Sequence, residues 1–142
     1  MLNKSKTEFK NVINVFVYGT LKPGESNYYL CENYVIAAKQ AVARGKLFHL
    51  PEGYPAMTPG DDQVHGYLLS FPDSQVLRIL DELEDYHPNK SGSENLYQRE
   101  YIEIFQPTGE FLGWAWVYLM TPEKVDQLSG IPQLNGCWTG DS

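Results

Sequence analysis

A nearly continuous apolar run that ends at a glycine is the feature that most constrains the fold of this chain. Residues 12–18 are mostly β-branched or aromatic, with Asn14 as the single polar exception, and Gly19 follows them directly. This composition predicts a β-strand, and the lack of polar alternation is typical of a strand buried on both faces. We therefore expect a central strand that ends at Tyr18 and turns at Gly19.

The rest of the chain predicts four more strands, two short helices and one longer helix. The strands are expected over residues 41–50, 64–71, 97–105 and 111–119, and the helices over 26–34, 74–86 and 122–128. The last two strands, joined by Pro107-Thr108-Gly109, form an expected hairpin. Because strands outnumber helices and regular helical crossovers are missing, the order favours an α+β fold over a doubly wound parallel sheet. We expect a small, mostly antiparallel β-barrel or curved sheet flanked by helices.

Length and composition indicate one soluble domain. The 142 residues fit a single domain, 1–142, in which we expect residues 1–11 and 130–142 to be peripheral. The net charge of -7 argues against a nucleic-acid partner and against docking on anionic lipid. No apolar run approaches the roughly 20 residues of a membrane span. The two cysteines, Cys31 and Cys137, form no metal-binding pattern, and a cytoplasmic protein with reduced thiols is expected.

Four acidic residues lie near the end of the longest expected helix, and only Glu84 is predicted to point inward. With Val76 at zero and about 100° per residue, the apolar stripe is centred near about 20°, and Glu84 falls at about 80°. Asp81, Asp85 and Glu82 fall at about 140°, 180° and 240°, which places them outward. Burial raises the pKa of a carboxyl group towards the range useful in acid–base catalysis. The alternatives are that Glu84 turns to solvent in a fraying last turn or pairs with an arginine.

The turn after the first strand offers backbone amides to a ligand. Gly19 allows close approach of a ligand, and successive N–H groups beyond a buried strand can hold an anion; an ordinary strand-to-loop turn is the alternative. Residues 19–26 also have the spacing of a phosphate-binding loop. However, Glu25 replaces the essential lysine and Pro23 removes an amide donor, so we reject nucleotide hydrolysis.

Nucleophile and metal chemistry find little support in the pattern. The chain has no Gly-x-Ser-x-Gly motif, and its three histidines, His49, His65 and His87, have no metal-ligand spacing. No histidine is tied to Cys137 by sequence, which favours a structural cysteine over a catalytic one.

Several short motifs, taken in order, carry a family resemblance. They are Val17-Tyr18-Gly19-Thr20-Leu21 with Gly24, then Gly53-Tyr54-Pro55-Ala56, then Leu80-Asp81-Glu82-Leu83-Glu84-Asp85-Tyr86, then Tyr97-Gln98-Arg99. In this order they resemble the γ-glutamylcyclotransferase-like superfamily, and within it the AIG2-like group that includes γ-glutamylamine cyclotransferases. The resemblance covers roughly residues 15–119. Many relatives carry glycine where this chain has Asp85, and this extra acid could change substrate choice.

The resemblance implies an enzyme, of the amide-cleaving, cyclising kind, that acts on a small γ-glutamyl compound. In the implied reaction the α-amine of the γ-glutamyl group attacks its own γ-carbonyl, which closes 5-oxoproline and expels an amine or amino acid. Glu84 is implied as the general acid and base. A cavity floored by Tyr18, Gly19, Thr20 and Leu21 is implied as the substrate site, without a metal or organic cofactor.

Three further residues are candidates for the same cavity. Tyr97 and Tyr101 are expected to line it, and Arg99 to pair with Glu84, with a substrate carboxylate or in a structural salt bridge. A binding protein that uses the same cavity without chemistry is the main alternative function. A protein-interaction domain is a third, for which the tryptophan-containing tail is the one candidate surface. The sequence carries no indication of an oligomeric state.

Overall fold

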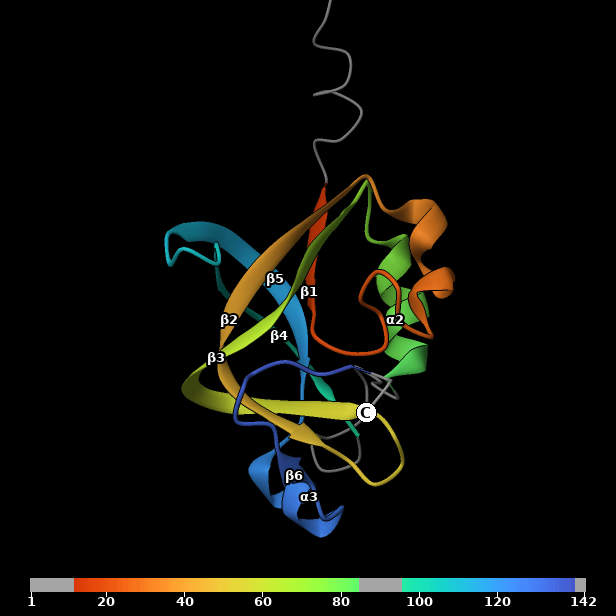
Figure 1. The fold of residues 1–142 in the computed structure, drawn as a ribbon. Helices are drawn as coiled ribbons and strands as arrows, with labels where there is room; N and C mark the ends of the chain where they lie inside the picture. Colours follow the sequence, from red (N-terminus) through yellow and green to blue (C-terminus); the bar gives the residue numbers. More distant parts are fainter. Residues whose placement is uncertain (1–11, 85–95, 140–142) are drawn as a thin grey trace, which may run out of the picture.

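The described residues form an α+β fold around one curved sheet (Figure 1). The computed structural model of the protein describes residues 12–84 and 96–139. The strands are β1 (Ile13–Val17), β2 (Ala37–His49), β3 (Pro55–Phe71), β4 (Gln98–Phe105), β5 (Phe111–Leu119) and β6 (Ile131–Pro132). The helices are α2 (Gln75–Leu83), α3 (Pro122–Gln127) and the 3₁₀ turns η1 (Tyr28–Leu30) and η2 (Glu32–Tyr34).

The sheet curves until its strands nearly close into a ring. The strand order is β3-β1-β5-β4-β2-β6, and a further β2–β3 pairing brings the order back to its start. All pairings are antiparallel except that of β1 with β5, where Val15 lies opposite Trp116. The β2–β4 pairing extends over two residue pairs only, so the ring is less regular than a clean barrel. The predicted α+β fold with a mostly antiparallel, curved sheet is confirmed.

Strand β1 is central, as its apolar run predicts. It lies between β3 and β5, and residues 15–17 are almost completely buried. Val15 and Val17 pack into one hydrophobic cluster, whereas Phe16 packs into the second cluster on the other face of the strand. Because both faces are covered, every residue of the run can be apolar.

Strand β3 is much longer than the sequence indicates. The register of the β2–β3 hairpin shifts by a bulge: Gly45 lies opposite Asp62, but the next residue, Lys46, lies opposite Thr58. Residues 59–61, Pro-Gly-Asp, therefore have no partner across the ladder. The sequence predicts only the C-terminal half of β3, because proline and glycine signal a turn, and in this hairpin a bulge accommodates them within the strand.

Two 3₁₀ turns replace the short helix that is predicted over residues 26–34. The amides of residues 30, 31, 34 and 35 each bond to the carbonyl three residues earlier, which is the 3₁₀ pattern. Asn27 occupies the cap position of η1, and no side chain caps it. The buried Cys31 joins the two turns.

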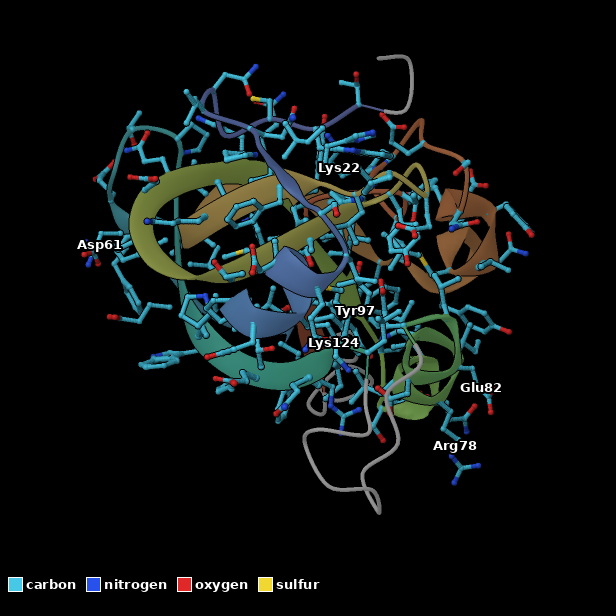
Figure 2. All side chains as sticks on the ribbon, turned by 90° about the horizontal axis from the view of Figure 1, so that it is seen from below. Lys22, Asp61, Arg78, Glu82, Tyr97 and Lys124 are labelled. Carbon is cyan, nitrogen blue, oxygen red and sulfur yellow. The ribbon has the colours of Figure 1, made fainter. Side chains whose placement is uncertain are left out.

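Helix α2 carries its apolar face against the sheet. Val76, Leu77 and Leu80 are buried, whereas Arg78 and Glu82 are exposed and point away from the body of the molecule (Figure 2). The helix ends at Leu83 with Glu84 in the cap position, and residues 85 and 86 of the predicted helix lie outside the described residues. Figure 1 shows α2 and the 3₁₀ turns on the same side of the sheet. None of the helices in the described part of the chain is long and apolar enough to cross a bilayer.

The C-terminal segment 131–138 packs against β2 and β3, although the sequence predicts a loop. Strand β6 pairs with the end of β2, and Gly136 accepts a hydrogen bond of 2.8 Å from the amide of His65. The Trp138 side chain is 2% exposed, and its indole N–H donates to Nδ1 of His49 at 2.9 Å. The tryptophan of this tail therefore lies in the core and contributes nothing to an exposed apolar surface.

Candidate active site

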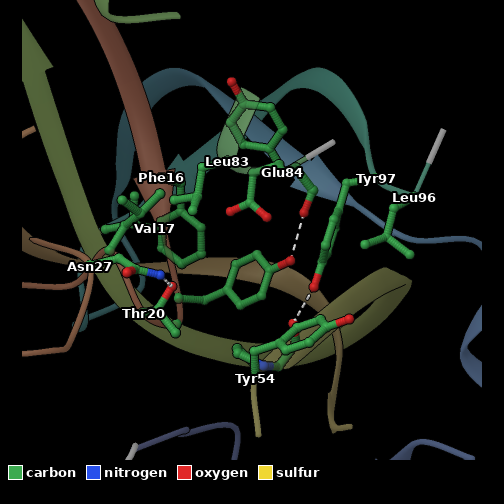
Figure 3. A pocket seen from close by; sticks show the side chains of 14 residues that line it. Phe16, Val17, Thr20, Asn27, Tyr54, Leu83, Glu84, Leu96 and Tyr97 are labelled. Carbon is green, nitrogen blue, oxygen red and sulfur yellow. Dashed lines mark hydrogen bonds between the residues drawn. The ribbon is translucent and has the colours of Figure 1, made fainter. Parts of the chain in front are cut away.

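A cavity of about 290 Å³ opens where β1 ends (Figure 3). The turn 18–21 forms one wall, and Tyr54 and Pro55 at the start of β3 form the next. The end of α2, residues 96–97 just before β4, and the side chains of Phe16, Val17, Asn27 and Tyr118 also line it. Segments far apart in the sequence thus meet at one cavity, whose volume is at the lower end of the range for small-molecule sites.

The Glu84 carboxylate points into this cavity (Figure 3). Its amide still bonds to the carbonyl of Leu80 at 2.9 Å, so the residue continues the helical path and the side chain leaves on the inner side that the helical wheel predicts. No residue that the structure describes forms a hydrogen bond or ion pair with the carboxylate. Burial away from water raises the pKa of Glu84 from 4.5 to about 7.

Gly19 is required by packing rather than by an unusual backbone angle. A Cβ atom at this position would lie 2.3 Å from Cγ of Pro55, well inside van der Waals contact. The carbonyls of Gly19 and Thr20 accept hydrogen bonds from the amides of Lys22 and Asn27. Outside the strand ladders, the described residues provide no acceptor for the amides of residues 19–21, and all three residues line the cavity.

Two tyrosines hold the walls of the cavity together. The Tyr18 hydroxyl donates to the carbonyl of Tyr118 at 2.6 Å and accepts from the amide of Met57 at 3.2 Å. The Tyr97 hydroxyl donates to the carbonyl of Pro55 at 2.6 Å. Burial raises the pKa of both phenols well above the usual value of 10. They therefore stay neutral and act as donors to the backbone.

Tyr54 is the pocket tyrosine whose hydroxyl remains available. The Tyr118 hydroxyl donates to Asp81 at 2.7 Å, and the hydroxyls of Tyr18 and Tyr97 also have partners. Within the described ranges the Tyr54 hydroxyl forms no hydrogen bond. Burial, followed by the nearby acids Glu52 and Glu84, raises its pKa. The side chain is half-buried, so it can meet a ligand as a neutral donor.

Two predicted site residues, Arg99 and Tyr101, lie outside the cavity lining. Nη1 of Arg99 forms an ion pair with Asp81, with distances of 2.8 and 3.0 Å to the two carboxylate oxygens. Tyr101 is 53% exposed and stacks on Trp114. Arg99 and Tyr101 lie on the same face as Tyr97, which directly precedes β4. Every two residues advance about 7 Å along a strand, so these two side chains lie farther from the cavity than Tyr97.

The helical wheel predicted that Asp81 points outward, and this prediction is wrong. Its side chain is 14% exposed and contacts β4 and β5 instead of solvent. At about 140° it lies on the flank of α2, where the curved sheet presents Arg99 and Tyr118.

Several lining residues have no role predicted from the sequence. They are Asn27, Tyr54, Leu83, Leu96 and Tyr118. Tyr54 and Leu83 lie inside the motifs quoted above, whereas nothing in the pattern marks Asn27 or Tyr118. The parts of the chain that the structure describes contain no cluster of three or more His, Cys, Asp or Glu side chains that could hold a metal ion.

The fold and the cavity define a class of α+β proteins in which a desolvated acid faces the turn after a central strand. Within that class, the chain belongs to the family described as γ-glutamyl cyclotransferase, AIG2-like, whose profile matches residues 15–140.

Named relatives agree with this family. The chain is 32% identical over 105 residues to the γ-L-glutamyl-butirosin B γ-glutamyl cyclotransferase of Niallia circulans, covering 74% of this chain and 66% of the relative. It is 36% identical over 108 residues to a putative γ-glutamylcyclotransferase of Vibrio cholerae, covering 74% and 79%. It is 32% identical over 102 residues to γ-glutamylaminecyclotransferase A of Danio rerio, covering 65% and 58%. The chain thus spans less than two thirds of the length of the first and third relatives.

Solved structures share the fold. An AIG2-like protein from Mus musculus superposes with a TM-score of 0.66 at 23% identity, covering 93% of this chain and 91% of that chain. YkqA from Bacillus subtilis superposes with a TM-score of 0.63 at 22% identity, covering 89% and 39%. At these identities the likeness extends to the fold alone.

Proposed function

We propose that this protein is an enzyme that cyclises the γ-glutamyl group of a small amine or peptide to 5-oxoproline and releases the amine. The observation that carries the proposal is the Glu84 carboxylate, which lies desolvated and unpaired among the described residues in the same cavity as the turn 18–21. A half-buried acid without a partner is costly for the fold, and a substrate ammonium group is the partner that this reaction supplies. Membership of the γ-glutamyl cyclotransferase family supports the reaction class.

In the proposed reaction Glu84 moves one proton twice. Its carboxylate removes a proton from the substrate α-ammonium, and the freed amine attacks the γ-carbonyl carbon to form a five-membered ring. Glu84 then gives this proton to the leaving nitrogen as the bond from the γ-carbon to that nitrogen breaks. The ring nitrogen, which carries one proton too many after the attack, loses it to become the lactam N–H, and the released amine takes up that proton as its ammonium form. A pKa of about 7 suits both steps near neutral pH. Because both reacting groups belong to one molecule, correct folding of the substrate removes much of the entropic barrier.

The free backbone amides after β1 are suited to negative charge on the substrate. Gly19, Thr20 and Leu21 offer N–H groups that have no acceptor outside the ladders among the described residues. In our proposal these groups hold the substrate α-carboxylate or the oxyanion that develops on the γ-carbonyl. The available hydroxyl of Tyr54 is a further donor to the substrate.

Replacement of Glu84 by glutamine tests the proposal. Glu84→Gln keeps the shape of the side chain but removes the base, so we expect kcat to fall at least about a hundredfold while substrate binding persists. Glu82→Gln is the matched control, because it removes the same charge from an exposed position on the same helix. The measurement is 5-oxoproline release from a panel of γ-glutamyl amines, γ-glutamyl dipeptides and glutathione.

Two results would contradict the proposal. Full activity of Glu84→Gln would remove Glu84 from the chemistry. Failure of the wild-type protein to turn over any compound of the panel, together with binding of one of them unchanged, would favour the alternative of a binding protein.

The proposed setting is the cytoplasm. Cys31 and Cys137 are free thiols, which supports a reducing compartment.

A further inference from the structure

A polar cluster joins the end of α2 to the hairpin β4–β5, directly beside the cavity. Asp81 on α2 accepts hydrogen bonds from Nη1 of Arg99 at 2.8 and 3.0 Å and from the Tyr118 hydroxyl at 2.7 Å. The guanidinium of Arg99 also lies over the ring of Trp116, 5.0 Å from its centre. Asp81, Arg99, Tyr118 and Trp116, from here on the Asp81 cluster, thus connect one helix to two strands.

The Asp81 cluster lies close to Glu84 along the helix, so it can influence the position of the Glu84 side chain. Asp81 precedes Glu84 by three residues, which is just under one helical turn. The buried apolar contacts of α2 are made by Val76, Leu77 and Leu80, all of which precede Asp81. Leu83 follows Asp81 and is partly buried against the core. Among the described residues, Asp81 is the last side chain of α2 that forms polar contacts with the sheet before the chain reaches Glu84.

The short length of α2 makes such a tie important. A nine-residue helix is not stable in isolation, and its final turn tends to fray. If the final turn frayed, the Glu84 carboxylate would leave the cavity for water, where its charged form is better solvated. Leu83, which is partly buried against the core, opposes this tendency from the apolar side of the helix, and the polar contacts of Asp81 with β4 and β5 add a second restraint.

The same cluster reaches the opposite wall of the cavity. The carbonyl of Tyr118 accepts the hydrogen bond from the Tyr18 hydroxyl at 2.6 Å. One residue, Tyr118, thus binds Asp81 through its side chain and Tyr18 through its backbone. The distance between the end of α2 and the turn that follows β1 is fixed through this residue.

We propose that Asp81, held by Arg99 and Tyr118, is a positioning residue that keeps the Glu84 carboxylate inside the cavity and opposite the turn 18–21. This inference rests on the proposed function for its kinetic consequence but not for its structural one. Arg99 was predicted to pair with Glu84, with a substrate carboxylate or in a structural salt bridge. Its ion pair is with Asp81, and in the proposal it acts on Glu84 through Asp81.

Replacing each half of the ion pair tests the proposal. The variants are Asp81→Asn, Arg99→Gln and the double variant, with Glu82→Gln as the control that removes an exposed charge one residue away. We expect Asp81→Asn to lower kcat about tenfold or more with KM changed less than about threefold, because a small misplacement of a reacting group is costly. The double variant should lose no more than the worse single variant, because the two side chains act as a unit.

A second measurement is independent of turnover. The titration of the Glu84 side-chain carboxyl is followed by carbon NMR and assigned by its loss in Glu84→Gln. In Asp81→Asn its midpoint should move from about 7 towards the ordinary glutamate range, whereas Glu82→Gln should leave it unchanged. The groups that face Glu84 across the cavity, Tyr18, Tyr54 and Tyr97, are retained in all variants.

The outcomes separate this proposal from the proposed function. If Asp81→Asn does not fold, Tyr118→Phe removes one hydroxyl from the cluster and should shift the Glu84 titration in the same direction. Folded variants that keep wild-type kcat and a wild-type Glu84 titration would overturn the positioning role. A wild-type protein that releases no 5-oxoproline would overturn the proposed function, and the titration would still decide the positioning role.

Discussion

At the scale of single residues, the charge state of Glu84 decides when the cavity can act. Burial raises the pKa of this carboxyl from 4.5 to about 7, so the base form predominates only above that pH. We therefore predict that kcat/KM falls about tenfold per pH unit below pH 7, measured at fixed ionic strength. An acid limb that instead begins near pH 4.5 would show that Glu84 is solvated or is not the base.

Gly19 provides a second test at this scale, because its missing side chain makes room for Pro55. We predict that Gly19→Ala weakens substrate binding and lowers stability by about 1–3 kcal/mol, since the new methyl group would lie 2.3 Å from Cγ of Pro55. Gly109→Ala is the control: it strains a turn with φ of +101° that does not line the cavity. Urea unfolding and substrate titration measure both effects. Equal loss of affinity in the two variants would contradict a specific role of the Gly19–Pro55 contact.

The residues that the sequence placed well are those governed by local periodicity. The direction of Glu84 follows from the helical wheel because its neighbours in α2 define the buried side. Asp81 could not be placed in this way, because its partners come from β4 and β5. Tyr101 was misplaced for a related reason, since strand alternation predicts a face but not the distance along it.

At the scale of elements, the C-terminal segment 131–138 stabilises the loops around the cavity. Trp138 is buried beside His49, and its carbonyl accepts a hydrogen bond from Nζ of Lys22, which directly follows the turn 18–21. We predict that Trp138→Ala lowers the free energy of unfolding by about 3–5 kcal/mol and raises KM. Leu134→Ala, in the same segment but 95% exposed, should change neither quantity.

Unfolding of Trp138→Ala and Leu134→Ala at the same urea concentration would contradict a stabilising role of segment 131–138.

The sequence could not indicate the packing of this segment, because the segment has no apolar periodicity. Backbone bonds to β2 and β3 fix its path, and Gly136, at φ of +71°, allows it to approach Gln63 closely. The N-terminal half of β3 was not predicted for a similar reason, because it contains a bulge that depends on pairing with β2.

At the scale of the whole molecule, the cavity acid should cost the protein stability. Between pH 4.5 and 7 the unfolded chain loses the Glu84 proton while the folded protein keeps it, so stability falls as the pH rises through this window. At about 1.4 kcal/mol per pKa unit, the loss is on the order of 3 kcal/mol. We predict that Glu84→Gln gains stability relative to wild type by this amount between pH 4.5 and 7.5.

Urea unfolding of both proteins across that pH range measures the difference. Glu82→Gln, at an exposed position, controls for the loss of one negative charge from an acidic protein. Parallel curves for wild type and Glu84→Gln would mean that the carboxyl is not desolvated in the folded state.

The sequence was sufficient to predict the general architecture. Five of the strands and the long helix have clear patterns, and together they predict the α+β class. The near closure of the sheet was only one of two predicted options, since it depends on the β2–β3 and β2–β4 pairings rather than on any single segment.

The bond between Tyr18 and Tyr118 also has a consequence for how the protein is made. Its partners are separated by 100 residues, and β1 lies in the sheet between β3 and β5, which follow it far along the chain. During synthesis, β1 can therefore pair with both of its neighbours only after β5 has been made, and such distant contacts form slowly. We expect a nascent chain that ends before β5 to lack Tyr118 and one of the two neighbours of β1, and therefore to lack a complete cavity.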